Sequence, residues 1–229
     1  MAVITVSRQL GSAGDLVAAR TAEFLKYEYV DKTLISEAAR VANVPESEIE
    51  KYDERDDSAI RRFLSSLLTP KTATSPMLFW GFEFPYDACA VMLTRESESD
   101  EVPILDRGEC LKFIQRTVQK LYERGNIVIV GRGSQIILRD YKNVLHVRTV
   151  ASREQRCART MQRRGVSRKG ALALNQKTDK QRVDYIRNHY RVDWDAPELY
   201  HLIINTGRTG IEMAARVVAD AVNKLSRSL

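Results

Sequence analysis

Short apolar runs recur along the chain, and stretches with a helical pattern of apolar residues separate them. The runs are three to seven residues long and most are rich in Val and Ile. Runs of this kind are typical of strands that are buried on both faces of a parallel sheet. They predict strands at residues 2–7, 28–30, 127–130, 144–150 and 202–204.

Apolar residues at helical spacing follow most of these predicted strands. They predict helices after the loop at 8–15, at 32–41, at 59–68, before Gly125, after the turn at 131–133, after residue 151 and at the C-terminal end. The positions expected to face a core are Leu16, Ala19, Ala22 and Leu25 in the first helix, Leu111, Ile114, Val118 and Leu121 before Gly125, and Ile211, Ala214, Val218, Val222 and Leu225 in the last helix.

Strands that alternate with helices predict an α/β fold with a mostly parallel sheet and helices on both faces. Functional residues of such folds gather at the carboxyl ends of the strands. The residues that fall there are Ser7, Asp31, Gly131, Arg132, Asn205 and Thr206. We expect a single domain over residues 1–229, with an inserted region at 32–105 and a basic segment at 152–195.

The inserted region has no continuous core pattern. Residues 46–57 are acidic, which is typical of a solvated helix face, and residues 69–76 and 95–103 have the composition of loops. Residues 77–86 are rich in Phe and Trp, which is typical of a core or of an interface between copies. A homodimer is therefore a candidate assembly.

Composition sets the class of the protein. Hydrophobic residues make up 44% and charged residues 29% of the chain, as in ordinary globular proteins. No apolar run approaches the roughly 20 residues that a membrane span requires, and no secretory signal pattern begins the sequence. The cysteines, Cys89, Cys110 and Cys157, lack metal-ligand spacing. Free thiols favour a cytoplasmic location, and we expect no membrane partner.

Positive charge is concentrated in the basic segment. Residues 152–191 contain twelve Lys and Arg against three acidic residues, a net charge of +9, whereas the whole chain carries +6. Such a segment attracts anions, either nucleotide phosphates or a nucleic acid. Aromatic residues are not interleaved with the cations as a base-stacking surface requires, which favours a compact polyphosphate over nucleic acid.

The loop at residues 8–15 points to phosphate binding. A buried strand, a glycine loop and a helix form the layout that aims backbone N–H groups and a helix N-terminus at a phosphate. The candidate phosphate-binding residues in this loop are Gly11, Ser12, Ala13, Gly14 and Asp15. A Walker-type loop would place Lys-Ser/Thr where this chain has Gly14-Asp15. The usual phosphate-binding lysine is therefore missing.

Two nucleotide-binding folds compete for this pattern. Residues 9–14 resemble a dinucleotide-binding glycine motif that has lost its first glycine, and Asp31 follows where an acid would contact a ribose. However, a Rossmann fold requires its third strand soon after Asp31, and the next convincing strand begins near Asn126. A long insertion there, and a basic segment between the last two strands, favour a kinase with an acceptor region and a lid.

Six segments of the chain resemble those of a known family. They are residues 4–14, 29–35, 130–133, 179–182, 190–194 and 199–206. In this order and over nearly the whole chain, they resemble the cytidylate kinase-like family, relatives of the P-loop nucleoside monophosphate kinases. The resemblance implies a three-layer P-loop kinase fold, ATP and Mg²⁺ as donor and metal, and a nucleotide and a small phosphorylated acceptor as binding partners.

The resemblance also implies roles for individual residues. The loop at 8–15 would surround the donor triphosphate. Asp31 would lie beside the acceptor nucleotide, and Arg132 would contact the acceptor phosphate. Arg182 would close over the phosphates, with Arg159 and Arg163 as further lid candidates. Arginine suits these roles because its planar fork makes bidentate contacts with phosphate. Independently of the resemblance, Asn205 and Thr206 at the end of the last predicted strand are candidates for lining the donor base.

Three departures from the family pattern carry their own hypotheses. Arg8 stands at the first Walker glycine, and it either replaces the missing lysine or braces the loop through an ion pair. Asp15 stands near the usual Mg²⁺-binding hydroxyl, where it either binds the metal or repels the donor. His201 stands where relatives carry an acid.

Simpler interpretations remain for the other candidates. In these interpretations Asp31 would only cap the next helix, Ser12 would be an ordinary loop serine, and Thr206 would only end a strand. The leading hypothesis is a kinase of a pyrimidine nucleoside monophosphate such as CMP or dCMP. The alternatives are a nucleotide-binding protein without phosphoryl transfer and a kinase of a non-nucleotide metabolite.

Overall fold

The computed structural model describes residues 1–31 and 107–225. The expectations for the inserted region, including its two helices, its aromatic segment and the homodimer interface, lie outside these residues. The chain divides into two units, residues 1–32 with 115–229 and residues 33–114. The architecture below is that of the first unit, together with the described residues 107–114 of the second unit, in which one helix begins.

Five parallel strands form one sheet in the order β2-β3-β1-β4-β5. The strands are β1 (Val3–Arg8), β2 (Glu28–Val30), β3 (Ile127–Val130), β4 (Val144–Val150) and β5 (Leu202–Asn205). All five lie where the apolar runs predict them. Both faces of β1 and β3 are fully buried, which explains why these strands read as continuous apolar runs rather than alternating ones.

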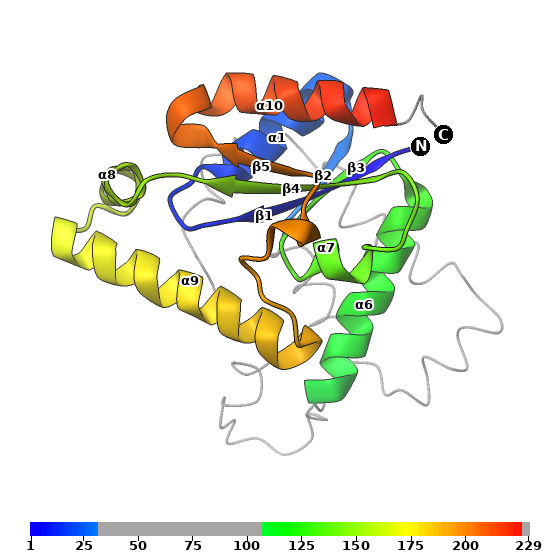
Figure 1. Ribbon diagram of the computed structural model, residues 1–229, viewed down its shortest axis with the longest axis horizontal. Coiled ribbons are helices and arrows are strands. Elements are labelled where there is room, and N and C mark those ends of the chain that lie inside the picture. The colour runs from blue at the N-terminus through cyan, green and yellow to red at the C-terminus, as the bar shows by residue number, and fades with distance from the viewer. Residues whose placement is uncertain (32–106, 226–229) are drawn as a thin grey trace, which may run out of the picture. The chain divides into compact units, whose positions relative to one another are not determined.

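Helices cover both faces of the sheet (Figure 1). They are α1 (Gly14–Leu25), α6 (Arg107–Arg124), α7 (Ser134–Ile137), α8 (Arg153–Arg164), α9 (Arg168–Tyr190) and α10 (Thr206–Leu225), with a short 3-10 turn η1 (Pro197–Leu199) before β5. Figure 1 shows α1 and α10 together on one face of the sheet and α7 and α9 on the other. The α/β fold class is confirmed.

The core between α1, α10 and the sheet shows one wrong prediction. The face of α1 that packs inward carries Val17, Ala18 and Thr21, whereas Leu16 and Leu25 are only partly buried. Small residues on the inner face allow α1 to approach both the sheet and α10 closely, so the larger leucines lie at its flanks. The prediction identified the helix, and Ala22 is buried as expected, but Val17, Ala18 and Thr21 take the inward positions expected for Leu16 and Ala19.

The basic segment folds as two helices joined by a short turn. Ser152 caps α8, with its hydroxyl accepting from the Gln155 N–H, and Gly165 ends the helix with φ +63°. Ser167 caps α9 in the same way through Gly170. No helix within residues 1–31 and 107–225 is long and apolar enough to cross a membrane.

The sheet order places the carboxyl end of β1 at a topological switch point. β1 pairs with β3 on one side and with β4 on the other. The connections leaving neighbouring strands at such a point diverge and open a crevice, which is where open α/β sheets bind ligands. The loop after β1 therefore lies at the position that this fold class uses for binding.

Candidate functional site

The loop that joins β1 to α1 presents main-chain N–H groups. In the described part of the chain, the N–H groups of Gly11, Ala13 and Gly14 donate to no protein acceptor. Ala13 caps α1 with φ +58° and provides no side-chain hydrogen bond to the first turn. Helix N-termini attract anions because their N–H groups are unsatisfied and the helix dipole is positive there. The loop thus has the chemistry of an anion-binding cradle.

Two glycines of the loop are required by close contacts. A Cβ on Gly14 would lie 2.3 Å from Thr149 Oγ1 and 2.5 Å from Arg8 Cβ. A Cβ on Gly11 would lie 2.5 Å from the Arg156 carbonyl oxygen, and Gly11 also has φ +78°. The loop is therefore packed tightly between β4 and α8, and no side chain fits at the position of the Walker lysine.

Arg8 and Asp15 form an ion pair across the loop. Arg8 Nε lies 2.7 Å from Asp15 Oδ1, and the Arg8 side chain is 4% exposed against 33% for Asp15. The bracing contact named as one hypothesis for Arg8 is thus present.

Four carbonyl oxygens of the loop accept hydrogen bonds from α8, α9 and α10. The pairs are Arg182 Nη1 with the Arg8 oxygen (2.6 Å), Arg156 Nη1 with the Leu10 oxygen (3.2 Å), Arg159 Nη1 with the Gly11 oxygen (3.4 Å) and Thr206 Oγ1 with the Ser12 oxygen (2.6 Å). Arg159 also donates to the hydroxyl and carbonyl oxygens of Thr206. The structure therefore brings the lid candidates Arg159 and Arg182 to the loop, where they contact its backbone.

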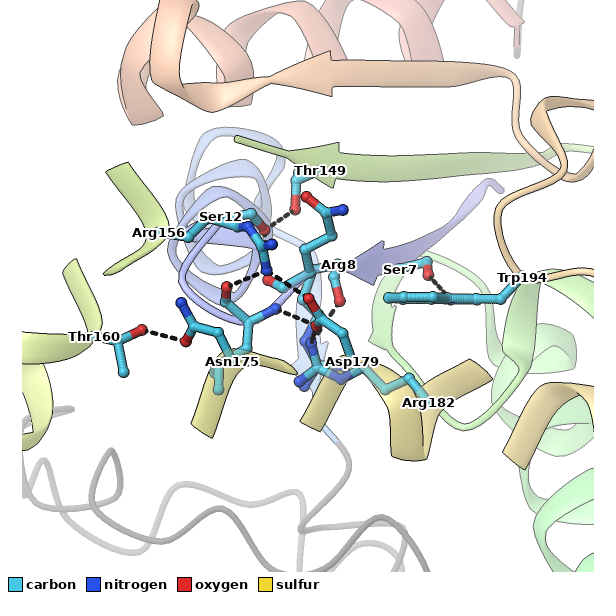
Figure 2. Close-up of polar contacts among 12 residues, drawn as sticks. Ser7, Arg8, Ser12, Thr149, Arg156, Thr160, Asn175, Asp179, Arg182 and Trp194 are labelled. Atoms are coloured by element: carbon cyan, nitrogen blue, oxygen red, sulfur yellow. Dashed lines mark hydrogen bonds and ion pairs between the residues drawn. The ribbon is translucent and has the colours of Figure 1, made fainter. Parts of the chain in front are cut away.

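Asp179 of α9 lies at the centre of these contacts (Figure 2). Its Oδ1 accepts from the Leu10 N–H at 2.8 Å, and its Oδ2 accepts from Arg156 Nη1 at 2.5 Å. Arg182 Nη1 lies 3.6 Å from Oδ1. Asp179 belongs to one of the segments that resemble the family, but the sequence alone indicates no role for it or for Arg156. The available signal was an acid retained within a strongly basic segment.

Ser12 is fully buried, and its side chain bonds the loop internally and to β4. Its hydroxyl donates to the Gln9 carbonyl oxygen at 2.8 Å and lies 2.9 Å from Thr149 Oγ1. The position of its side chain thus fits the simpler interpretation of a loop serine, while its main chain belongs to the cradle.

Tyr29 links the loop electrostatically to the end of β2. Burial raises the pKa of its hydroxyl, and the charges of Asp15 and Asp31 raise this pKa further. The cations Arg8 and Arg163 act in the opposite direction. Asp31 and the exposed Arg163 of α8 therefore lie within electrostatic range of the same side chain as the Arg8–Asp15 pair.

Arg132 follows β3 and lies near the end of α9. It is 5% exposed and has φ +57°. Its charge lowers the pKa of the Tyr190 hydroxyl, although burial, the largest effect, raises that pKa overall. A Cβ on Gly133 would lie 2.6 Å from the Tyr190 ring. Arg132 thus lies within electrostatic range of Tyr190 at the end of α9, and it follows β3, the strand that pairs with β1.

The carboxyl end of β1 also contacts the segment after α9. Trp194 Nε1 donates to Ser7 Oγ at 2.8 Å (Figure 2). The Arg148 guanidinium stacks on the Trp194 ring at 4.1 Å and donates to the Trp194 carbonyl oxygen and to Asp195. The sequence predicts Ser7 at a strand end but carries no signal for its partner Trp194.

His201, the third departure from the family pattern, contacts the strand next to it. Its Nδ1 accepts from the His146 main-chain N–H at 2.9 Å, and the two rings stack 5.0 Å apart. His146 is buried beside Thr5, with 2.7 Å between its Nδ1 and Thr5 Oγ1. Both histidines thus have structural contacts.

The sequence model of the cytidylate kinase-like family matches residues 3–208. A search of curated proteins found no match. Among solved structures, the chain is similar to an uncharacterized protein from Eubacterium ventriosum, with a TM-score of 0.65 and 20% identity over 97% of this chain and 99% of that one.

The chain is also similar to two further solved structures, shikimate kinase from Bacteroides thetaiotaomicron and a gluconokinase from Sinorhizobium meliloti. Their TM-scores are 0.48 and 0.47, at 9% and 13% identity, and the matches cover 97% and 99% of this chain and 98% and 94% of theirs.

The likeness to the Eubacterium ventriosum protein shows a common fold. The family match supports a P-loop kinase fold and a kinase of nucleotides or small metabolites. Because that match extends over well more than half of the sequence, the resemblance inferred from the motifs is confirmed, and the chain belongs to the cytidylate kinase-like family.

Proposed function

We propose that the chain is an ATP-dependent phosphotransferase that phosphorylates a small phosphorylated acceptor, a pyrimidine nucleoside monophosphate such as CMP or dCMP. The observation that carries this proposal is the loop after β1, whose N–H groups at Gly11, Ala13 and Gly14 have no protein acceptor in residues 1–31 and 107–225. Family membership supports the kinase class, and it supports CMP only by analogy.

The loop supplies what phosphoryl transfer requires of a protein. That reaction depends mainly on positioning and on stabilising charge spread over phosphate oxygens. N–H groups at the start of α1 would hold the donor phosphates, and the guanidinium of Arg8 beside them would supply the positive charge of the missing lysine. Arg8 is thus our candidate catalytic residue, together with Arg132 and Arg182.

The acceptor would lie at the strand ends next to the loop. Arg132 follows β3, which pairs directly with β1, and Asp31 follows β2 on the outer side of β3. An arginine and an acid at neighbouring strand ends suit an acceptor phosphate and a hydrogen-bonding group of a sugar or base.

Magnesium has one candidate ligand in this arrangement. Mg²⁺ is usually held by one or two carboxylates together with phosphate oxygens and water. Within the described ranges no group of three or more metal-binding side chains occurs, and Asp15 is paired with Arg8. Asp15 would hold the ion only after exchanging its Arg8 partner, so we assign no step of the reaction to the metal.

The proposal is tested by direct detection of phosphoryl transfer. The full chain would be incubated with ATP and Mg²⁺ and with CMP, dCMP, UMP, AMP, GMP or a metabolite pool, and products would be identified by mass spectrometry. Formation of CDP or dCDP above all other products is the expected result. A phosphorylated sugar or organic acid would instead identify a kinase of a non-nucleotide metabolite.

A second candidate function is nucleotide binding without transfer. The observation that favours it is the Arg8–Asp15 pair, because the acid offsets the charge that would replace the lysine. Saturable ATP binding with no product from any acceptor would support this function. We include a cytoplasmic location in either proposal, in keeping with the free thiol of Cys157.

A further inference from the structure

The main chain of Leu10 is held by one ion pair that spans two helices. Its N–H donates to Asp179 Oδ1 at 2.8 Å, and its carbonyl oxygen accepts from Arg156 Nη1 at 3.2 Å. Arg156 and Asp179 bond each other at 2.5 Å and are 15% and 18% exposed. A single pair of side chains, from α8 and α9, therefore satisfies both polar main-chain groups of one loop residue.

This contact determines where the next N–H group points. In a trans peptide the C=O of one residue and the N–H of the following residue point in opposite directions, and no cis peptide occurs in the described residues. When Arg156 holds the Leu10 oxygen, the Gly11 N–H is directed away from Arg156. The same relation holds between the Ser12 oxygen, bonded by Thr206, and the Ala13 N–H. Both of these N–H groups belong to the cradle described above.

From this geometry we infer that Asp179 and Arg156 are positioning residues for the nucleotide donor: by holding both main-chain groups of Leu10, they aim the Gly11 N–H at a phosphate oxygen. This inference rests on the proposed function. It assigns Asp179 no contact with the donor, and it makes α8 and α9 the source of the loop's shape.

The direction in which one substitution changes phosphate binding distinguishes positioning from simple electrostatics. Asp179 is a negative charge close to a site proposed for phosphates, so its neutralisation should strengthen phosphate binding if charge alone matters. Positioning predicts the opposite, because Asp179→Asn breaks the ion pair with Arg156 and releases the Leu10 carbonyl oxygen. An asparagine still offers one oxygen to the Leu10 N–H, so Asp179→Ala should weaken binding more than Asp179→Asn.

The experiment measures binding of ATP and of inorganic tripolyphosphate to the full chain by isothermal titration calorimetry. We expect Asp179→Asn to weaken both by about tenfold, the loss typical of one hydrogen bond to a charged group. The double variant Asp179→Asn/Arg156→Gln should bind no more weakly than the weaker single variant, because the two residues act as a unit.

A matched control lies on the same helix. Asp184→Asn makes the same change in charge, and within residues 107–225 and 1–31 Asp184 has no hydrogen bond or ion pair to the loop. It should bind both probes at least as tightly as the unaltered chain. Equal or tighter binding by a folded Asp179→Asn variant would overturn the inference while leaving the proposed function intact.

A second measurement uses the unaltered chain, so it tests the inference even if the Asp179→Asn variant does not fold. The chain has eleven glycines, so selective ¹⁵N-glycine labelling gives a simple amide spectrum. Tripolyphosphate should shift the Gly11 signal, and a Gly11 signal that stays in place while the probe binds overturns the inference. If the unaltered chain binds neither ATP nor tripolyphosphate, the proposed function fails and this inference fails with it.

Discussion

Arg8 and Asp15 face each other across the loop that joins β1 to α1, with 2.7 Å between Nε and Oδ1. Arg8 is the last residue of β1, and Asp15 lies in the first turn of α1. The pair therefore joins the two elements that the loop connects. It also means that the cation proposed to replace the missing lysine has an acid as its partner.

The first prediction decides between the two hypotheses for Arg8. If Arg8 replaces the lysine, Arg8→Ala should lower the rate of phosphoryl transfer by roughly 10²–10³, the usual effect of removing one preorganised charge-stabilising donor. Arg8→Lys should retain part of that rate. Single-turnover kinetics with saturating ATP and acceptor provide the measurement. A folded Arg8→Ala variant with unaltered transfer would leave Arg8 only its bracing role.

The second prediction concerns an attempt to restore the Walker lysine. Gly14→Lys should not increase phosphoryl transfer, because its Cβ would lie 2.3 Å from Thr149 Oγ1 and 2.5 Å from Arg8 Cβ. The clash should lower the free energy of unfolding by about 1–3 kcal/mol or more, as overpacking does. Urea denaturation checks the stability, and mass spectrometry checks the transfer.

Gly170→Ala is the matched control for that substitution. A Cβ on Gly170 makes only ordinary contacts of 3.5 Å or longer, and the residue lies in the first turn of α9. Alanine is the better helix former, so this variant should be unchanged or more stable by up to about 1 kcal/mol. A stable and more active Gly14→Lys variant would show that the loop opens more easily than its packing indicates.

The strands could be predicted from sequence because burial on both faces leaves a simple signal. Runs such as Ile127–Val130 contain only β-branched residues, and their order along the chain fixed the α/β class. The inner face of α1 could not be predicted in this way. Its small residues Val17 and Ala18 pack inward because α10 and the sheet lie close, and that closeness depends on the tertiary arrangement.

The sequence predicted which residues of the candidate site lie together, but it did not predict which groups they contact. The glycine loop, Arg159, Arg182 and Thr206 were all expected at one site, and the structure brings them together. Sequence alone could not tell that these arginines donate to loop carbonyl oxygens, because a guanidinium can donate either to a phosphate or to a carbonyl oxygen. Asp179 was missed for a related reason, since its role depends on a main-chain N–H that carries no sequence signal.

The third prediction is a loss of stability in mild acid that depends on His146. Burial, aided by the nearby His201, lowers the pKa of His146 to about 4 from an ordinary value of 6.5. Between these values the unfolded chain binds more protons than the folded one, so the free energy of unfolding falls as the pH falls. The contribution of this residue is about 3 kcal/mol over the whole interval.

The test compares the unaltered chain with His146→Gln by urea denaturation at several pH values from 7 to 4. The variant should be less stable at pH 7, because the contact with Thr5 is altered. The difference between the two proteins should then shrink as the pH falls through 6.5 toward 4. Parallel curves for the two proteins would contradict the assignment of this pH dependence to His146.

The fourth prediction concerns the contact between Trp194 and Ser7, which ties the segment after α9 to the carboxyl end of β1. Trp194→Phe removes the 2.8 Å hydrogen bond to Ser7 Oγ and weakens the stacking with Arg148. Both losses act at buried groups, so the free energy of unfolding should fall by about 1–3 kcal/mol. Ser7→Ala removes only the hydrogen bond and should cost about 1 kcal/mol.

A double-mutant cycle isolates the hydrogen bond from the stacking. The variant Ser7→Ala/Trp194→Phe should be less destabilised than the two single variants combined, by about 1 kcal/mol, because one bond is lost in either case. Urea denaturation followed by circular dichroism suits this comparison, since it does not depend on the indole that is removed. Strictly additive losses would show that the indole and the hydroxyl do not stabilise each other. In that case the stacking of Arg148 on Trp194, together with its bond to the Trp194 carbonyl oxygen, would hold this segment against the sheet.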